Sequence, residues 1–270
     1  MGGRGGEAHL LLAVNVGNTN TVLGVFRGDE LQWQWRMSTQ AERTADELAV
    51  LLGGLLDQAA LSFTSQITGV VISSVVPTST TALREMVNRY FNFPPVVVEP
   101  GTRTGIQIAT DNPREIGADR IVNALAAFHR YGGPCIVIDF GTATTYDVVS
   151  DKGEFLGGAI APGVQTSNAS LSRETARLPQ VELHAPRAAI GRNTVEAIQS
   201  ALIFGTAAEA DGMIERMRKE LGGQVTKVVA TGGLASLVIP HCQLVDEHDP
   251  WLTLEGLRLV FDKNAGPADA

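Results

Sequence analysis

Two short segments of the sequence combine glycine with amide and hydroxyl side chains in a pattern suited to binding an anion. The first follows the apolar run Leu10–Val16 and reads GNTNT, and the second follows Cys135–Phe140 and reads GTATT. Backbone N–H groups at a glycine turn, assisted by Asn and Thr side chains, form a cradle for phosphate oxygens. Two such cradles could grip the β- and γ-phosphates of a nucleotide without a lysine.

The two segments are also copies of each other. LLAVNVGNTNTV and CIVIDFGTATTY align without a gap at an offset of 124 residues, which pairs Asn15 with Asp139, Gly17 with Gly141, Asn18 with Thr142 and Thr21 with Thr145. Either turn alone would be an ordinary hairpin, for which Asn, Gly and Thr are common. A repeat reveals architecture, and this one predicts two similar lobes whose glycine turns face one cleft.

The commoner phosphate-binding and catalytic motifs are missing from the sequence. The four lysines do not follow a glycine, which excludes a Walker A loop: Lys152, Lys219, Lys227 and Lys263. There is no G-x-S-x-G elbow, no H-E-x-x-H pair and no protein-kinase signature. The paired glycine turns are therefore the leading candidate for chemistry.

Strands and helices alternate around these turns. We expect strands at 10–16, 21–26, 31–38, 67–76, 95–99 and 135–140 and from Lys227, and helices after Thr44, at 80–90, from Gly117, at 194–221 and at 252–261. Thr44 and Glu47 have the spacing of a capping box. This alternation predicts an α/β fold.

Composition limits the class of protein. Of 270 residues, 44% are hydrophobic and 19% charged, enough to build a core, and the net charge of −8 argues against nucleic acid or an anionic membrane as partner. The two cysteines lack metal or redox spacing, and no apolar run approaches the ~20 residues of a membrane span. We expect a cytoplasmic protein with a flexible leader at 1–9 and a tail at 265–270.

The same segments resemble those of type III pantothenate kinases, in the superfamily of acetate and sugar kinases and actin. The resemblance runs in family order from Leu10 to Asn264 through NVGNTNTVLGVF, TADELAVLL, SSVVP, DNPREIGADRIVNALAA, IDFGTATTYDVVS, GEFLGGAIAPGVQTS, GRNTVEAIQS, TGG and LTLEGLRLVFDKN. It implies an α/β fold of duplicated ribonuclease-H-like (actin-like ATPase) lobes around a nucleotide cleft. We expect the lobes at 10–133 and 134–264.

The resemblance implies ATP-dependent phosphorylation of pantothenate to 4'-phosphopantothenate, the first step of coenzyme A biosynthesis, with Mg²⁺ and K⁺ or NH₄⁺. It implies a general base at Asp119 and a monovalent-cation ligand at Asp139. The implied phosphate contacts are Asn15, Val16, Gly17, Asn18, Thr19, Asn20, Thr21, Val22 and Thr142. The implied pantothenate contacts are Gly117, Ala118, Asp119, Arg120 and Thr194.

The chemistry of these residues agrees with those roles. Phosphoryl transfer needs positioned phosphates and a carboxylate that takes the proton of the attacking hydroxyl. Asp119 lies in the predicted first turn of a helix, where the dipole favours the ionised form. Arg120 is the nearest cation for a substrate carboxylate.

Two of the three positions that depart from the family pattern keep alternatives open; the third is Ala201, in place of a glycine. Asn15 occupies the place of an aspartate that would help to hold hydrated Mg²⁺. It favours an alternative in which the chain is a catalytically impaired, nucleotide-binding regulatory relative. Thr110 replaces a tyrosine next to D-N-P, which leaves open a kinase of another small hydroxy acid.

Two further features bear on partners and metals. The resemblance implies a homodimer, and the apolar stretch 195–217 is a candidate interface. A compact group of possible metal ligands follows no recognised spacing and is expected to be a polar surface loop: His241, Cys242, Asp246, His248 and Asp249.

Overall fold

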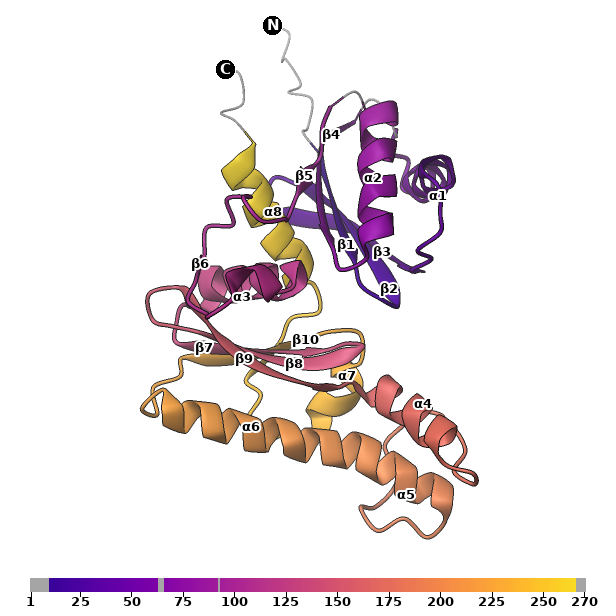
Figure 1. Ribbon diagram of the computed structural model, residues 1–270, viewed down its shortest axis with the longest axis vertical. Helices are drawn as coiled ribbons and strands as arrows, with labels where there is room; N and C mark the ends of the chain where they lie inside the picture. Colours follow the sequence, from indigo (N-terminus) through magenta and orange to yellow (C-terminus); the bar gives the residue numbers. More distant parts are fainter. Residues whose placement is uncertain (1–9, 63–65, 92, 266–270) are drawn as a thin grey trace, which may run out of the picture. The chain divides into compact units, whose positions relative to one another are not determined.

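The computed structural model describes residues 10–62, 66–91 and 93–265, so the predicted leader and nearly all of the predicted tail lie outside the described residues. Its contacts divide the chain into two compact units. The first contains the segments up to 105, 114–122 and from 253, and the second contains 106–113 and 123–252. Each unit is built on one β-sheet (Figure 1).

The sheet of the first unit has the order β3-β2-β1-β4-β5. Its strands are β1 (Leu10–Val16), β2 (Asn20–Arg27), β3 (Glu30–Ser38), β4 (Ile67–Ser74) and β5 (Val96–Val97). The first three form an antiparallel meander, and β4 and β5 run parallel to β1. β1 is buried on both faces, as its continuous apolar sequence predicts.

The second sheet repeats this order. It runs β11-β10-β7-β8-β9-β6, with strands β6 (Gln107–Ile108), β7 (Cys135–Phe140), β8 (Ala143–Val149), β9 (Glu154–Pro162), β10 (Lys227–Thr231) and β11 (Glu247–His248). β7, β8 and β9 form the antiparallel meander, and β10 and β11 are parallel to β7. Apart from the edge strand β6, both sheets have one topology, which confirms the predicted duplication.

The gapless alignment of the two copies holds for β1 and β7 but is wrong by one residue for the strands that follow. Val16 pairs with Thr21, whereas the equivalent Phe140 pairs with Thr144 and not with Thr145. The physical reason is turn length. Gly17 N–H donates to the Asn20 carbonyl, whereas Gly141 N–H donates to the carbonyl of Ala143, which makes the second turn one residue shorter.

Helices cover both faces of the first sheet. α1 (Ala45–Gln58) and α2 (Pro77–Tyr90) pack with alternate residues of β1 and β4 in one apolar core. α8 (Leu252–Asn264), near the end of the chain, belongs to the first unit and covers the opposite face of its sheet. There a side chain at Gly24 would collide with Leu254, and one at Gly69 with the ring of Phe261.

The second sheet packs against α4 (Val164–Glu174), α5 (Thr194–Ser200), α6 (Thr206–Glu220) and α7 (Ala235–Val238) in a second core. A π-helical segment, Ala201–Gly205, joins α5 to α6, so the predicted helix at 194–221 is nearly continuous. β9 and α4 were not predicted from the sequence. Gly157, Gly158 and Pro162 interrupt the apolar pattern there, and such residues are typical of turns.

α3 (Ala118–Tyr131) belongs to both units, since the boundary between them falls after Val122. Its second half packs in the second unit, where Phe128 lies against Gly133 and Gly153. No helix among the described residues is long and apolar enough to span a membrane. Both cysteines are free thiols, and burial raises the pKa of Cys135 to about 12 and of Cys242 to about 11, so both stay protonated.

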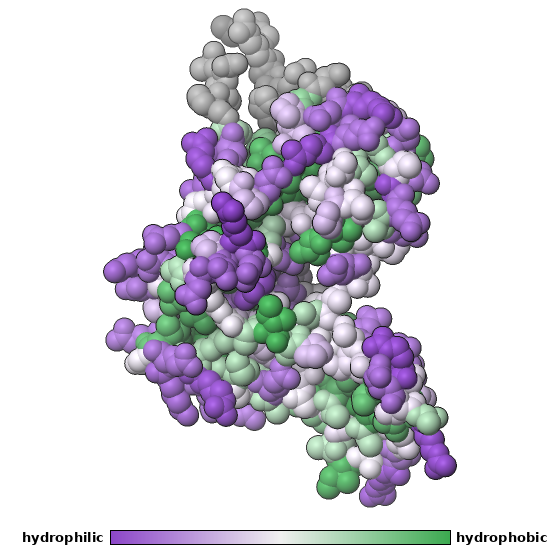
Figure 2. Space-filling view, in the orientation of Figure 1, coloured by the Kyte–Doolittle hydropathy of each residue, from purple (hydrophilic) through white to green (hydrophobic). Residues whose placement is uncertain are grey.

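The surface carries a few large apolar side chains, which Figure 2 shows among mostly polar ones. In the second unit these are Leu156, Ile160, Ile190 and Val195. In the first unit they are Val50 and Leu51 on α1.

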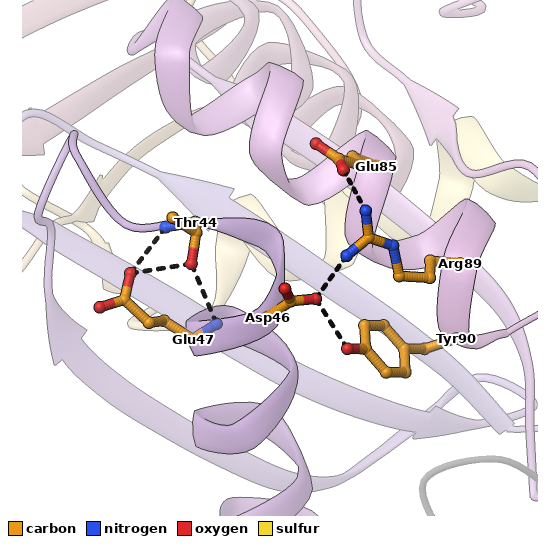
Figure 3. A network of polar contacts seen from close by, with 6 residues as sticks. All are labelled: Thr44, Asp46, Glu47, Glu85, Arg89 and Tyr90. Carbon is orange, nitrogen blue, oxygen red and sulfur yellow. Dashed lines mark hydrogen bonds and ion pairs between the residues drawn. The ribbon is translucent and has the colours of Figure 1, made fainter.

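Polar contacts fix the start of α1 and join it to α2 (Figure 3). Thr44 accepts from Glu47 N–H at 3.3 Å, and its own N–H donates to the Glu47 carboxylate at 2.8 Å, which confirms the predicted capping box. In the same first turn, Asp46 accepts from Tyr90 Oη at 2.7 Å and Arg89 Nη1 at 2.6 Å. Both bonds lower the pKa of Asp46, and the bond from Tyr90 has the larger effect.

The cap gives a direct test of local stability. We expect Thr44→Ala to lower the free energy of unfolding by about 1 kcal/mol, because α1 loses the acceptor for one orphan N–H. Thr44→Ser keeps the oxygen and serves as control. Urea denaturation followed by circular dichroism measures both, and equal midpoints for the two variants would contradict the role of the cap.

Candidate functional site

The first glycine turn joins β1 to β2. Asn15 and Val16 end β1, residues 17–19 form the turn, and Asn20, Thr21 and Val22 begin β2. The turn is tight, since a Cβ at Gly17 would lie 3.2 Å from the Asn20 carbonyl oxygen. Asn18, Thr19 and Asn20 are exposed, so backbone and side-chain donors of the turn are accessible within the first unit.

The amide oxygen of Asn15 lacks a partner among the residues that the structure describes. This oxygen, Oδ1, is buried and accepts no hydrogen bond within the described residues, and the same holds for Oγ of Ser73. Asn15 and Ser73 are register partners on the parallel strands β1 and β4, so their side chains share one face of the sheet. Two neighbouring oxygen acceptors suit the water shell of Mg²⁺, which keeps several of its waters in proteins. A neutral amide fits that shell without supplying charge.

The second glycine turn joins β7 to β8 and holds Thr142. The Thr142 carbonyl accepts from Gly163 N–H at 3.0 Å and from Thr166 Oγ1 at 2.6 Å. A side chain at Gly163 would lie 2.3 Å from the Gly141 carbonyl oxygen, so only glycine permits this approach. The Thr142 side chain itself is exposed.

Asp139, near the end of β7, contacts several elements of the second unit. A Cβ at Gly232, whose φ is +99°, would lie 2.4 Å from Asp139 Oδ1, so the TGG turn after β10 packs directly on this carboxylate. Asn123 on α3 donates from Nδ2 to Asp139 Oδ2 at 3.3 Å. The structure thus joins Asp139 to the second glycine turn and to the TGG turn. A carboxylate is a ligand that suits a hard cation.

Asn123 is a candidate site residue that the sequence prediction missed. It is 1% exposed, and its Oδ1 is buried without a hydrogen-bond partner in the described residues. A helix position among apolar residues favours a hydrophobic side chain, and a buried unpaired amide oxygen is costly. The sequence offered one signal, a single amide within the apolar run of α3. That signal does not distinguish a site residue from an ordinary buried polar residue.

Asp119 lies in the first turn of α3, as predicted, and folds back on the residues before it. Its Oδ1 accepts from Arg120 N–H at 2.9 Å, and a Cβ at Gly117 would lie 2.6 Å from that oxygen. Burial raises the pKa of Asp119 and outweighs the hydrogen bond and the charge of Arg120, which lower it. The prediction that the helix start favours the ionised form of Asp119 is therefore wrong, since the raised pKa disfavours that form. A carboxylate with a raised pKa is a stronger base near neutral pH.

The remaining candidates lie at two other places. Gly117 and Ala118 lead into α3, in the first unit with Asp119, Arg120 and the first glycine turn. Thr194 is the exposed first residue of α5, behind the cap that Asn193 forms on Glu196 N–H at 2.9 Å. The described contacts do not link Thr194 to Asp139.

The group of His241, Cys242, Asp246, His248 and Asp249 does not form a metal site. Over the described residues, no cluster of three or more His, Cys, Asp and Glu side chains could hold a metal ion. Two of its members have structural bonds instead: Asp246 accepts from Val228 N–H at 2.7 Å, and Asp249 from Arg130 Nη1 at 2.8 Å.

Comparisons with known proteins identify relatives over nearly the full chain. A family model described as type III pantothenate kinase matches residues 11–216. A type III pantothenate kinase of Frankia alni is 55% identical over 256 residues, which cover 94% of this chain and 100% of the relative. One of Streptomyces griseus is 51% identical over 265 residues, covering 96% and 100%.

Solved structures support the fold. Component A of (R)-2-hydroxyglutaryl-CoA dehydratase from Acidaminococcus fermentans has a TM-score of 0.56 at 14% identity and covers 96% of this chain and 100% of its own. MreB 5 of Spiroplasma citri has a TM-score of 0.55 at 11% identity, covering 95% and 96%. With the two matching sheets, these similarities give the chain a duplicated, actin-like α/β fold.

The raised pKa of Asp119 predicts a pH-dependent stability difference. The folded state binds the Asp119 proton more tightly than the unfolded state does. The folded protein therefore loses stability as the pH rises from the pKa of Asp119 in the unfolded chain, about 3.9, through its higher pKa in the folded chain. We expect Asp119→Asn to melt higher than the natural chain at pH 7, with the gain vanishing near pH 4. Thermal melts between pH 4 and 8 measure it.

Asp46→Asn is the matched control, because the pKa of Asp46 is lowered. Its substitution should reduce the melting temperature at neutral pH, and this loss should shrink in acid. If Asp119→Asn behaves like Asp46→Asn, burial does not dominate at Asp119.

Proposed function

The chain belongs to the type III pantothenate kinase family, and we propose that it transfers the γ-phosphoryl group of ATP to the primary hydroxyl of pantothenate. The product is 4'-phosphopantothenate, and the reaction opens coenzyme A biosynthesis. The observation that carries this proposal is the match to relatives of that name at 51% and 55% identity over 94% or more of the chain. No comparison supports the regulatory or alternative-substrate hypotheses that Asn15 and Thr110 left open.

The two glycine turns are proposed to bind the phosphates of ATP. Residues 15–22 would hold one part of the triphosphate through N–H groups and the side chains of Asn18 and Thr19, and Thr142 would contribute from the second turn. Asn15 and Ser73 would accept hydrogen bonds from the water shell of Mg²⁺, which neutralises charge on the transferred group when bound. The exposure of Asn18 and Thr19 and the orphan oxygen of Asn15 support this role.

Asp119 is proposed to accept the proton of the pantothenate hydroxyl as it attacks the γ-phosphorus. Its raised pKa supports this role, because a general base works best with a pKa near the working pH. Gly117 and Ala118 would let the substrate approach this carboxylate, and Arg120 would pair with the pantothenate carboxylate. Thr194 is proposed as a further pantothenate contact.

Asp139 is proposed to hold a monovalent cation, K⁺ or NH₄⁺. Its carboxylate lies against the TGG turn, and the buried Oδ1 of Asn123 is a second oxygen close by that lacks a partner among the described residues. A bound cation would supply positive charge near the phosphates, where this chain has no lysine. The residues present fit that need.

We propose a homodimer, but the interface expected at 195–217 needs revision. Ile203, Ala207, Ala210 and Ile214 are buried in the core of their own unit, so that apolar face is already used. The second unit keeps other apolar residues at the surface, with Ile160 64% and Ile190 86% exposed. We propose that these two, with Leu156 and Val195, contribute to the interface.

Phosphoryl transfer tests the catalytic roles. We expect Asn15→Asp to raise phosphorylation of pantothenate at least about tenfold, because a carboxylate adds charge toward hydrated Mg²⁺. Asp119→Asn should reduce the rate about 10²–10⁴-fold, because an amide does not accept the proton. A coupled assay of ADP release, with and without K⁺, measures both variants.

ATP binding by calorimetry is the control, and both variants should retain it. A natural chain as fast as Asn15→Asp would show that the neutral amide suffices. If the chain binds ATP but no variant phosphorylates pantothenate, the substrate assignment fails.

Light scattering tests the interface. We expect Ile160→Asp to convert a dimer into a monomer at micromolar concentration, because a charge is costly in a buried apolar contact. Val50→Asp is the control: Val50 is 75% exposed on α1 of the first unit, and its substitution should leave the dimer intact. A monomeric natural chain, or a dimeric Ile160→Asp variant, would contradict this interface.

A further inference from the structure

Thr39, which is not part of the first glycine turn, forms hydrogen bonds with it. It follows directly after β3 and makes three contacts with the turn. Its N–H donates to the Thr19 carbonyl at 2.9 Å, its Oγ1 donates to the Gly17 carbonyl at 2.8 Å, and Oγ1 lies 2.9 Å from Oγ1 of Thr21. The Thr39 hydroxyl therefore contacts the residues on both sides of the turn, Gly17 and Thr21, and the Thr39 backbone contacts Thr19 between them.

These bonds set the direction of two peptide groups. A peptide is planar and trans, so its N–H points away from its carbonyl. Because the Thr39 hydroxyl binds the Gly17 carbonyl, the N–H of Asn18 in the same peptide group points away from Thr39. The Thr39 N–H binds the Thr19 carbonyl, so the N–H of Asn20 also points away from Thr39. In a tight hairpin the first carbonyl often accepts from the fourth N–H. Here that carbonyl bonds to the Thr39 hydroxyl.

We propose that Thr39 is a positioning residue for ATP, which keeps the N–H groups of Asn18 and Asn20 oriented toward the phosphates. The inference rests on the proposed function, because residues 15–22 are the proposed phosphate loop. Thr39 acts through the loop and needs no contact with the nucleotide. The effect is preorganisation: donors already oriented lose less freedom when the ligand binds.

The second copy of the fold has a similar contact, which supports the inference independently. There Thr166, in the first turn of α4, donates from Oγ1 to the carbonyl of Thr142, the residue after Gly141, at 2.6 Å. β9 is the counterpart of β3 in the duplicated sheets. In both copies, the hydroxyl of a threonine that follows the third strand of the meander binds a carbonyl of the glycine turn, from the residue after β3 in one copy and from α4 in the other. Two unrelated sequence contexts, RMSTQ and APGVQTS, converge on this contact.

The matched pair Thr39→Val and Thr39→Ser tests the role of the hydroxyl. Valine keeps the shape of threonine and removes its oxygen, and serine keeps the oxygen. We expect Thr39→Val to weaken binding of Mg·ATP about tenfold, measured by calorimetry, and to raise KM for ATP similarly with KM for pantothenate unchanged. Thr39→Ser should stay within about twofold of the natural chain.

Thr68→Val controls for general destabilisation. Thr68 lies on β4 of the same unit, and its hydroxyl donates to the Leu10 carbonyl at 3.4 Å, at the opposite end of β1 from the turn. This variant should keep the natural affinity for ATP even if its melting temperature falls as far as that of Thr39→Val.

Natural affinity in Thr39→Val would overturn the inference, as would equal losses of ATP affinity in Thr39→Val and Thr68→Val or in Thr39→Val and Thr39→Ser. Because calorimetry needs no pantothenate, the two proposals fail separately. A chain that binds ATP in a Thr39-dependent way without phosphorylating pantothenate supports the inference and contradicts the substrate. A natural chain that does not bind Mg·ATP contradicts both.

Discussion

Neither glycine turn carries a lysine, so a phosphate bound there as proposed would be held mainly by peptide N–H groups. Such a group donates only in the direction that its peptide plane sets. The rest of each unit supplies that direction. The antiparallel meander aligns both ends of each turn, and a threonine after the third strand bonds to a turn carbonyl, Thr39 in one copy and Thr166 in the other. The close approach at Gly163 serves the same end, since a side chain there would displace the second turn.

The duplicated framework carries different chemistry at equivalent places. Asn15 pairs in register with Ser73, and the equivalent Asp139 pairs with Thr231. In the first copy both side chains are neutral, and each leaves an oxygen without a partner in the described residues. In the second copy the side chain is a carboxylate bonded by Asn123. One scaffold therefore presents a neutral oxygen pair in one unit and a carboxylate in the other.

Local patterns predicted the elements that present the candidate residues, and long-range contacts escaped prediction. The apolar runs before GNTNT and GTATT fixed β1 and β7, and Thr44 with Glu47 marked the start of α1. The one-residue register shift between the copies was not predictable, because hydrogen bonds at Asn20 and Ala143 decide it. The bond from Asn123 to Asp139 and the return of α8 to the first sheet depend on tertiary packing, which hydrophobic periodicity does not encode. The prediction missed β9 for a local reason, because Gly157, Gly158 and Pro162 interrupt its apolar pattern.

The raised pKa of Asp119 connects stability to reactivity. A carboxylate chosen for stability at the start of a helix would stay solvated and benefit from the dipole. Asp119 instead folds over Gly117 into a partly buried position, where its ionised form is disfavoured. The local sequence permits this, because a side chain at residue 117 would occupy the space of the carboxylate. Groups that destabilise the fold and gain reactivity concentrate at functional sites. The position of Asp119 therefore fits the proposed role in proton transfer better than a role in helix stability, and the space left by Gly117 belongs to that proposal.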